Sequence, residues 1–241
     1  MQVSNFTCQI VEDQQDNAHI LESIYRLRYQ VYVNEWGFEN PQDHPEGLER
    51  DPYDQHSLHF YAYTDTVDNI IGTARLILDS NSTLPIEQHF DIHELPEGVP
   101  RNKIAEISRL AISKDFRRRA IDSVIFSRGE SYVDELAQHQ ATIKQVERER
   151  RKCEHELIRG IYLLIYRESI KRGLTHWYAV MARGLHVILG RWGIQFKQVG
   201  PAREYHGLRA PYLLCIRDLE RYLAKRNPEL LELARQEAPG T

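Results

Sequence analysis

The sequence predicts a mixed α/β fold, because helical and extended apolar patterns follow one another along the chain. Apolar residues recur at helical spacing from Ile20 to Val31, which predicts a first amphipathic helix that ends near Gly37. Three β-type runs follow, at residues 58–64, 70–78 and 103–112. The first two are expected to pair as a hairpin, and the later alternation indicates both antiparallel and parallel strands.

The segments between these runs are predicted to be loops. Residues 39–56 contain several proline, glycine and asparagine breakers among many carboxylates, and a loop of this length hints at a function. Residues 79–102 are rich in Pro, Ser and Glu, and we expect a short turn around residues 86–90.

The second half continues the alternation. Residues 117–156 are charged and helix-permissive with few apolar positions, so we interpret them as a helical insertion. A strong apolar stripe at 157–171 predicts a buried helix that ends at Gly173. Further elements are expected at 176–181 (strand), 185–192 (helix), 194–199 and 212–216 (strands), and in a helical tail at 218–241. We therefore expect a single domain over residues 1–241.

Composition limits the class of protein. The 241 residues, 41% of them hydrophobic and 27% charged, fit a globular chain, and no apolar run approaches the roughly 20 residues that span a bilayer. The first residues lack the pattern of a secretion signal, so we expect a cytoplasmic protein without stable membrane insertion. The net charge of -4 argues against a nucleic-acid partner. Three cysteines without paired spacing predict neither a disulfide framework nor a zinc site.

Four short pieces of sequence carry the residues expected to do chemistry. They are Arg28 with Trp36, Asp51-Pro52-Tyr53-Asp54, Gly72-Thr73-Ala74-Arg75-Leu76, and Glu106-Ile107-Ser108-Arg109. In this order and spacing they resemble the signature of the acyl-homoserine lactone synthases, with Tyr32 where that family usually has Phe. The second half, which contains Tyr205-His206-Gly207 and Arg209-Ala210-Pro211-Tyr212, is more similar to the acyltransferases of PEP-CTERM/exosortase systems and to N-acyl amino acid synthases.

This resemblance implies a GNAT-like three-layer α/β/α sandwich with a mixed, splayed central sheet. It also implies an N-acyltransferase that moves a medium or long fatty acyl group from acyl carrier protein or acyl-CoA to the amine of a small molecule. The amine would attack the thioester directly, without an acyl-enzyme, and the acyl donor is a substrate rather than a bound cofactor.

The chemistry of such an attack assigns roles to the matching residues. It requires a neutral amine, a hydrogen-bond donor for the developing oxyanion and a channel for the acyl-carrying arm. Glu106 would accept the ammonium proton through water, and we predict a catalytic set of Glu106, Arg109 and Asp54. The predicted substrate-binding residues are Arg28, Tyr32, Trp36, Asp51 and Arg75.

A separate basic cluster concerns the acyl donor. Residues 110–120 resemble the GNAT segment that binds the donor's pyrophosphate, but the glycines usual in that loop are missing. Arg117, Arg118 and Arg119 stand there instead, and they suit phosphate or an acidic carrier protein. We therefore favour acyl carrier protein as the donor and as a protein partner.

Simpler interpretations stand beside these. The arginines and carboxylates also fit a structural ion-pair network, Arg117–Arg119 fit a solvated turn, and Trp36 fits ordinary packing. The histidine pairs 56/59 and 89/93 lack a third ligand, so no metal site is predicted. The alternative functions are acyl-homoserine lactone synthesis from S-adenosylmethionine, acetyl-CoA-dependent N-acetylation, and acyl binding without catalysis.

The spacing of Glu106 and Arg109 makes a geometric prediction. Residues three apart on a regular strand face opposite sides of the sheet. Both side chains can reach one cleft only if a β-bulge lies between or beside them, and GNAT-like folds are known for such a bulge. We therefore predict a bulge in this strand.

Overall fold

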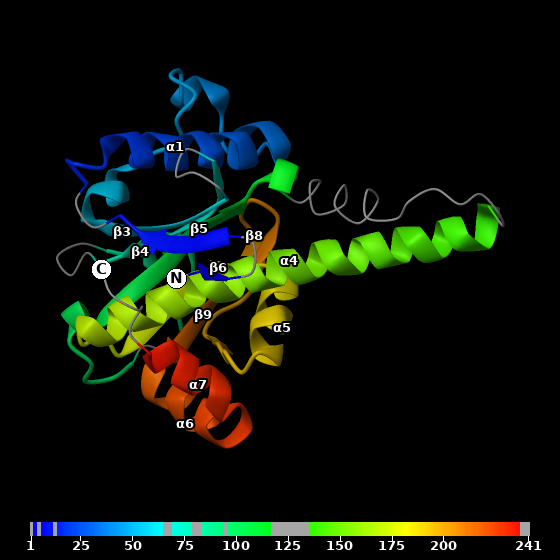
Figure 1. Cartoon of the computed structure of the whole chain (residues 1–241). Coiled ribbons are helices and arrows are strands. Elements are labelled where there is room, and N and C mark those ends of the chain that lie inside the picture. Colours follow the sequence, from blue (N-terminus) through cyan, green and yellow to red (C-terminus); the bar gives the residue numbers. More distant parts are fainter. Residues whose placement is uncertain are drawn as a thin grey trace.

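The computed structural model describes residues 2–3, 6–11, 14–64, 69–78, 83–93, 96–116 and 135–236, and in it a mixed β-sheet lies between two layers of helices (Figure 1). The strands are β1 (Gln2–Val3), β2 (Phe6–Ile10), β3 (Ser57–Tyr63), β4 (Ile70–Ile77), β5 (Ile104–Ile112), β6 (His176–Met181), β7 (Lys197–Gln198), β8 (Arg203–Glu204) and β9 (Leu208–Cys215). The α-helices are α1 (Ala18–Tyr29), α2 (Pro85–His89), α4 (Glu135–Lys171), α5 (Arg183–Arg191), α6 (Ile216–Arg226) and α7 (Pro228–Arg235). A π-helical turn, η1 (Gln30–Glu35), extends α1, and 3-10 turns occur at η2 (Pro41–Asp43), η3 (Pro52–His56) and η4 (Arg101–Lys103).

The sheet combines the two expected kinds of pairing. Its strand order is β1-β2-β3-β4-β5-β6-β9-β7, with β8 paired to β9. The predicted hairpin is β3–β4, which places Phe60 opposite Ala74. Strands β5 and β6 are parallel, whereas the other described pairs are antiparallel. The mixed α/β prediction is confirmed.

One helix layer is α1. Its apolar stripe packs Ile20, Ile24 and Leu27 against the side of the sheet that presents Tyr61 and Ala111. These helical residues are three or four positions apart, so they share one face and are buried together. The first predicted helix is therefore confirmed, with its last turns formed by the π-helical η1 before Gly37.

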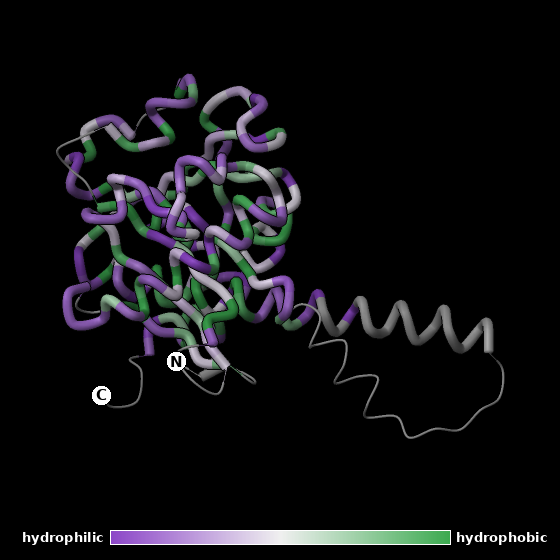
Figure 2. Tube along the Cα trace, turned by 90° about the horizontal axis from the view of Figure 1, so that it is seen from above, coloured by the Kyte–Doolittle hydropathy of each residue, from purple (hydrophilic) through white to green (hydrophobic). Residues whose placement is uncertain are grey.

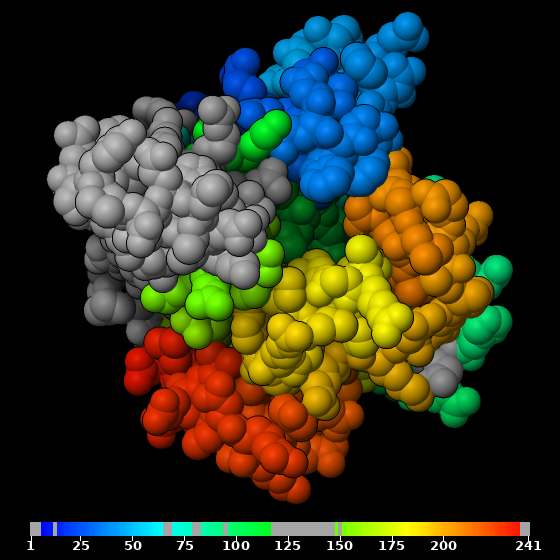
Figure 3. All heavy atoms as spheres, turned by 90° about the vertical axis from the view of Figure 1, so that its right-hand side faces the viewer, coloured from blue at the N-terminus to red at the C-terminus, as the bar shows by residue number. Residues whose placement is uncertain are grey.

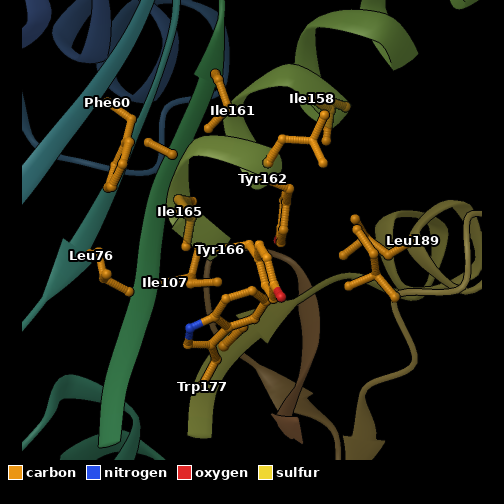
Figure 4. Close-up of a cluster of buried hydrophobic side chains, with 14 of the residues drawn as sticks. Phe60, Leu76, Ile107, Ile158, Ile161, Tyr162, Ile165, Tyr166, Trp177 and Leu189 are labelled. Atoms are coloured by element: carbon orange, nitrogen blue, oxygen red, sulfur yellow. The ribbon is translucent and has the colours of Figure 1, made fainter. Parts of the chain in front are cut away.

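The opposite face carries α4 and the later helices. Leu157, Ile161 and Ile165 are fully buried, and the stripe they form on α4 meets the sheet beside Trp177 (Figure 4). The Trp177 indole donates a 2.8 Å hydrogen bond to Ser169 Oγ, which satisfies its only polar atom. In the hydropathy view, hydrophobic segments occupy the interior of the body (Figure 2).

Two predicted elements differ in extent. The charged residues before Leu157 and the apolar stripe after it belong to one helix, α4, whose first part extends beyond the sheet (Figure 1). The strand predicted at 194–199 is only Lys197–Gln198, because Ile194 N–H bonds the carbonyl of Leu189 and closes α5 instead. Residues 117–134 of the predicted insertion lie outside the described residues. In the part of the chain that is described, no helix is long and apolar enough to cross a membrane.

Candidate active site

Strand β5 contains the predicted bulge. Between Ser108 and Ala111 it advances three residues while the paired strand β4 advances only two. Arg109 lies within this step and has a φ of 51°, in the left-handed region that side-chain-bearing residues rarely adopt. The extra residue turns Arg109 toward the pocket that Glu106 also lines, so both side chains reach one cavity.

Strands β5 and β6 part close to this bulge. Their ladder ends at the pair Ile107–Ala179, whereas β6 remains paired with β9 as far as Met181. The β6-facing edge of β5 therefore has no strand partner beyond Ile107 among the described residues. Figure 3 shows a hollow on this side of the molecule, with the green middle of the chain at its floor between the blue N-terminal segment, yellow α5 and the orange β8–β9 region.

A pocket of about 270 Å³ lies against this part of β5. Its walls come from η1, the loop that contains η3, strands β4, β5 and β6, helix α2 and the β8–β9 hairpin. The lining residues are mostly aromatic or charged: Tyr32, Phe38, Tyr53, Phe90, Tyr205, His89, His206, Glu39, Asp51, Glu106, Arg75, Arg109 and Arg209, with Pro85, Ile86, Ile107, Ser108 and Val180.

Glu106 is the buried carboxylate of this pocket. Its residue is 3% exposed, and Oε2 accepts a 2.9 Å hydrogen bond from the backbone N–H of Ile86 at the start of α2. Burial raises the pKa of Glu106 to about 7, although the Ile86 bond and Arg75 act in the opposite direction. The carboxyl group can therefore exchange a proton near neutral pH, as a general base requires.

Two of the predicted arginines share a carboxylate behind the pocket. Arg28 donates to Asp54 at 2.7 Å and also bonds Glu49. Arg75 donates to Asp54 at 2.8 Å and to Asp51 at 2.6 Å. These contacts tie α1, the long loop and β4 together.

Arg109 extends the network into the pocket. Its guanidinium lies 3.0 Å from Glu49 and 3.3 Å from both Glu39 and Asp51, and it stands 5.6 Å from the ring centroid of Tyr32. Burial alone would raise the pKa of Glu49, but the charges of Arg28 and Arg109 lower it to about 2. Glu49 thus remains a buried anion that holds Arg109 in place.

The predicted site residues fall into four groups. Glu106, Arg109, Tyr32, Asp51 and Arg75 line the pocket. Arg28 and Asp54 are buried in the ion-pair network and are absent from the pocket wall, as the structural interpretation expected for them. Trp36 is 55% exposed and stacks on Phe38 at the surface. Arg117, Arg118 and Arg119 lie outside the described residues.

Several residues in and behind the pocket wall were not predicted. Glu49 joins two of the predicted arginines, and Phe38, Glu39 and Arg209 complete the wall. His206 has a φ of 53°, which is typical of a turn residue, and it also lines the pocket, with Nε2 3.9 Å from Glu39. Among the described residues, no group of three or more His, Cys, Asp or Glu side chains is placed to hold a metal ion.

The N-terminal part of this site lies in a recognisable sequence family. Residues 27–127 match the family described as an acetyltransferase (GNAT) domain. Residues 27–127 thus carry the sequence features of a GNAT domain. This GNAT match includes η1, the long loop, β4 and the bulged strand β5, whereas the β8–β9 hairpin lies after it. None of the curated proteins compared with the chain matches it significantly.

The GNAT domain and the rest of the fold resemble acyl-homoserine lactone synthases of known structure. TofI, in a ternary complex with an inhibitor and MTA, is 20% identical with a TM-score of 0.61, over 93% of this chain and 99% of that one. BjaI, a CoA-dependent acyl-homoserine lactone synthase with SAM and isopentyl-CoA, is 13% identical with a TM-score of 0.60, over 95% and 98%. FeeM, an N-acyl amino acid synthase from uncultured soil microbes, is 12% identical with a TM-score of 0.51, over 91% and 96%. At these identities the likeness is one of fold.

Proposed function

We propose that this acyltransferase moves a medium or long fatty acyl group from an acyl-carrier thioester to the amine of a small molecule. The observation that carries the proposal is the position of Glu106, a buried carboxylate with a pKa of about 7 in a pocket that adjoins the parting of β5 and β6. A proton acceptor thus stands beside the gap in which an extended acyl-carrying arm would fit.

The proposed reaction is a direct attack. Glu106 takes a proton from the acceptor's ammonium group, through water, and leaves a neutral amine. The amine nitrogen then attacks the thioester carbonyl, and backbone N–H groups on the β6-facing edge of β5 stabilise the oxyanion. The C–N bond forms first, and the oxyanion then collapses with cleavage of the C–S bond. One of the two protons on the nitrogen goes to the departing thiolate, and the other stays on the amide nitrogen. Arg109 keeps the pocket in shape through Glu49 and Asp51.

For the donor, we favour acyl carrier protein over coenzyme A. The support is the sequence after β5, which lacks the usual glycines and contains three consecutive arginines at 117–119. Arginine clusters bind acidic and phosphorylated surfaces well. The CoA-dependent enzyme BjaI shares the fold, so coenzyme A thioesters are the direct competitor in any assay.

Product analysis tests the proposal. Purified protein is incubated with octanoyl, dodecanoyl and hexadecanoyl thioesters of acyl carrier protein and of coenzyme A, together with a panel of amines, and the products are identified by mass spectrometry. A new N-acyl compound is expected, and Glu106→Gln and Arg109→Ala are expected to make much less of it. Full activity in both variants would overturn the proposal, and bound thioester without product would favour a non-catalytic acyl-binding module.

Acyl-homoserine lactone synthesis is the second candidate. It is favoured by the fold shared with TofI and BjaI and by the Arg, Asp and Glu series in the first half of the chain. The same assay with SAM as acceptor separates the two, because this candidate predicts an N-acyl lactone as the product. The similarity to PEP-CTERM-associated acyltransferases and the cytoplasmic location stay predictions.

A further inference from the structure

The arginines around the pocket differ in what they bind. Arg28, Arg75 and Arg109 each have at least two carboxylate partners within the protein. They are therefore already neutralised. Arg209 also lines the pocket, but among the described residues it has no carboxylate within ion-pair distance.

Arg209 is nevertheless held in a defined position. Its Nε donates a 3.0 Å hydrogen bond to the backbone carbonyl of His206, and its guanidinium carbon stands 5.4 Å from the ring centroid of Phe38. These contacts orient the guanidinium plane without cancelling its charge. The two terminal nitrogens remain as a pair of donors, which is the arrangement that binds a carboxylate through two parallel hydrogen bonds.

We propose that Arg209 binds the carboxylate of the acceptor, and hence that the acceptor is an α-amino acid rather than a simple amine. This inference rests on the proposed acyltransferase function. An α-amino acid carries its amine one carbon away from its carboxylate. Glu39 and Glu106 line the same pocket as Arg209, so carboxylates are present for the ammonium group of a ligand whose carboxylate is held by Arg209.

The charges of the pocket agree with such a ligand. Two of the wall carboxylates, Glu39 and Asp51, are engaged by Arg109, whereas the Glu106 carboxylate accepts only a backbone N–H in the described contacts. The pocket thus presents one arginine without a carboxylate and one carboxylate without an ion-pair partner. A zwitterionic acceptor complements both, whereas a simple amine would leave Arg209 without a counter-ion.

The test compares acceptors that differ only in the carboxylate. Each L-amino acid is assayed beside its carboxamide and its decarboxylated amine. SAM, which is itself a modified α-amino acid, is assayed separately, so that its use as acceptor can be told apart from the use of ordinary amino acids. The wild type is expected to prefer the carboxylate form. Arg209→Gln should raise the acceptor KM about 10- to 100-fold and abolish that preference, with little change in the KM of the acyl donor. Arg209→Lys keeps the positive charge but loses the pair of parallel donors, so its acceptor KM should lie between those of the wild type and Arg209→Gln.

Arg203 provides the matched control. It pairs with Arg209 across the β8–β9 hairpin, but it is exposed and does not line the pocket. Arg203→Gln should therefore leave the carboxylate preference unchanged. If both substitutions change the carboxylate preference equally, the preference depends on the structure of the hairpin rather than on Arg209, and the inference is overturned. An unchanged preference in Arg209→Gln would also overturn it.

Calorimetric binding of the same amino acids and carboxamides, without any thioester, separates this inference from the proposed function. If no thioester yields a product but amino acids still bind and Arg209→Gln abolishes that binding, acyl transfer fails while the carboxylate site stands. If products form equally well from acids and carboxamides, acyl transfer stands and the role of Arg209 is rejected.

Discussion

Arg28 and Arg75 share one oxygen of a single carboxylate: the Oδ1 atom of Asp54 lies 2.7 Å from the first and 2.8 Å from the second. The other oxygen of Asp54 accepts the backbone N–H of Asp51 at 2.8 Å and closes the turn η3. Asp54 therefore joins α1, η3 and β4 at one point. This geometry favours a role in positioning the pocket wall over contact with substrate.

Asp54→Asn should destabilise the fold strongly. The substitution removes the negative charge that the buried guanidinium groups of Arg28 and Arg75 share. Loss of one partner from a buried ion pair typically costs about 3–5 kcal/mol in the free energy of unfolding. Urea unfolding of the variant measures the loss. Glu22→Gln is the control, since the Glu22–Arg26 pair is 55% and 65% exposed and should change stability by less than about 1 kcal/mol. A stable but inactive Asp54→Asn would instead support the predicted catalytic role.

The sequence is informative where local pattern decides the structure. The stripe from Ile20 to Val31 is buried as predicted, and the spacing of Glu106 and Arg109 correctly required a bulge. The short strand β2 shows the same kind of signal, with Phe6 and Cys8 buried at alternate positions, but five residues alone are a weak pattern.

Other features depend on contacts that local pattern does not contain. Glu49 is one carboxylate among many in its loop, and its importance comes from Arg28 and Arg109, which are 21 and 60 residues away. Likewise, only the folded hairpin, with Arg209 against Phe38, shows that Arg209 has no carboxylate partner among the described residues. A strand was predicted at 194–199, yet Ile194 is used to close α5.

The pH dependence of turnover should report Glu106. If it acts as a base, kcat/KM should rise with pH and level off above about 7, the pKa to which burial raises this carboxyl group. Glu106→Gln should lower turnover by about 100-fold and remove the inflection near pH 7. The residual rate should then follow only the ionisation of the acceptor amine. An unchanged inflection in the variant would exclude Glu106 as its source.

The same carboxyl group should affect stability with the opposite trend. Its pKa is about 7 in the folded protein against an ordinary 4.5, so between these values the folded state keeps a proton that the unfolded chain has lost. Its contribution is complete below pH 4.5 and falls by about 3 kcal/mol as the pH rises through about 7. Denaturant unfolding at several pH values should therefore show that the free energy of unfolding of Glu106→Gln increases relative to that of the wild type as the pH rises through this range. A constant difference would contradict the raised pKa.

Arg109 combines a strained backbone with several ion pairs, and two substitutions separate these effects. Arg109→Gly and Arg109→Ala both remove the contacts to Glu39, Glu49 and Asp51. Only glycine tolerates a φ of 51° without strain, so Arg109→Gly should be about 1–2 kcal/mol more stable than Arg109→Ala. Thermal or urea unfolding compares them. If alanine is equally stable, the bulge does not persist without the arginine.

Gly200 determines how closely the β8–β9 hairpin approaches the segment after α2. A Cβ atom at this position would stand 2.2 Å from the backbone oxygen of Asp91 and 2.9 Å from the Pro211 side chain. The neighbouring backbone is already joined to this segment, since His93 N–H bonds the carbonyl of Val199 at 2.8 Å. Because a backbone oxygen cannot swing aside as a side chain can, the two segments must separate.

Gly200→Ala should therefore cost about 1–3 kcal/mol in the free energy of unfolding and raise the acceptor KM, because the displaced hairpin carries His206 and Arg209. Gly190→Ala in α5 is the matched control, since a Cβ there meets no atom within 4 Å and alanine favours a helix. Unfolding curves and acceptor titrations of both variants give the comparison. If Gly200→Ala changes neither quantity while Gly190→Ala behaves as expected, the hairpin does not depend on this close approach for its place beside α2.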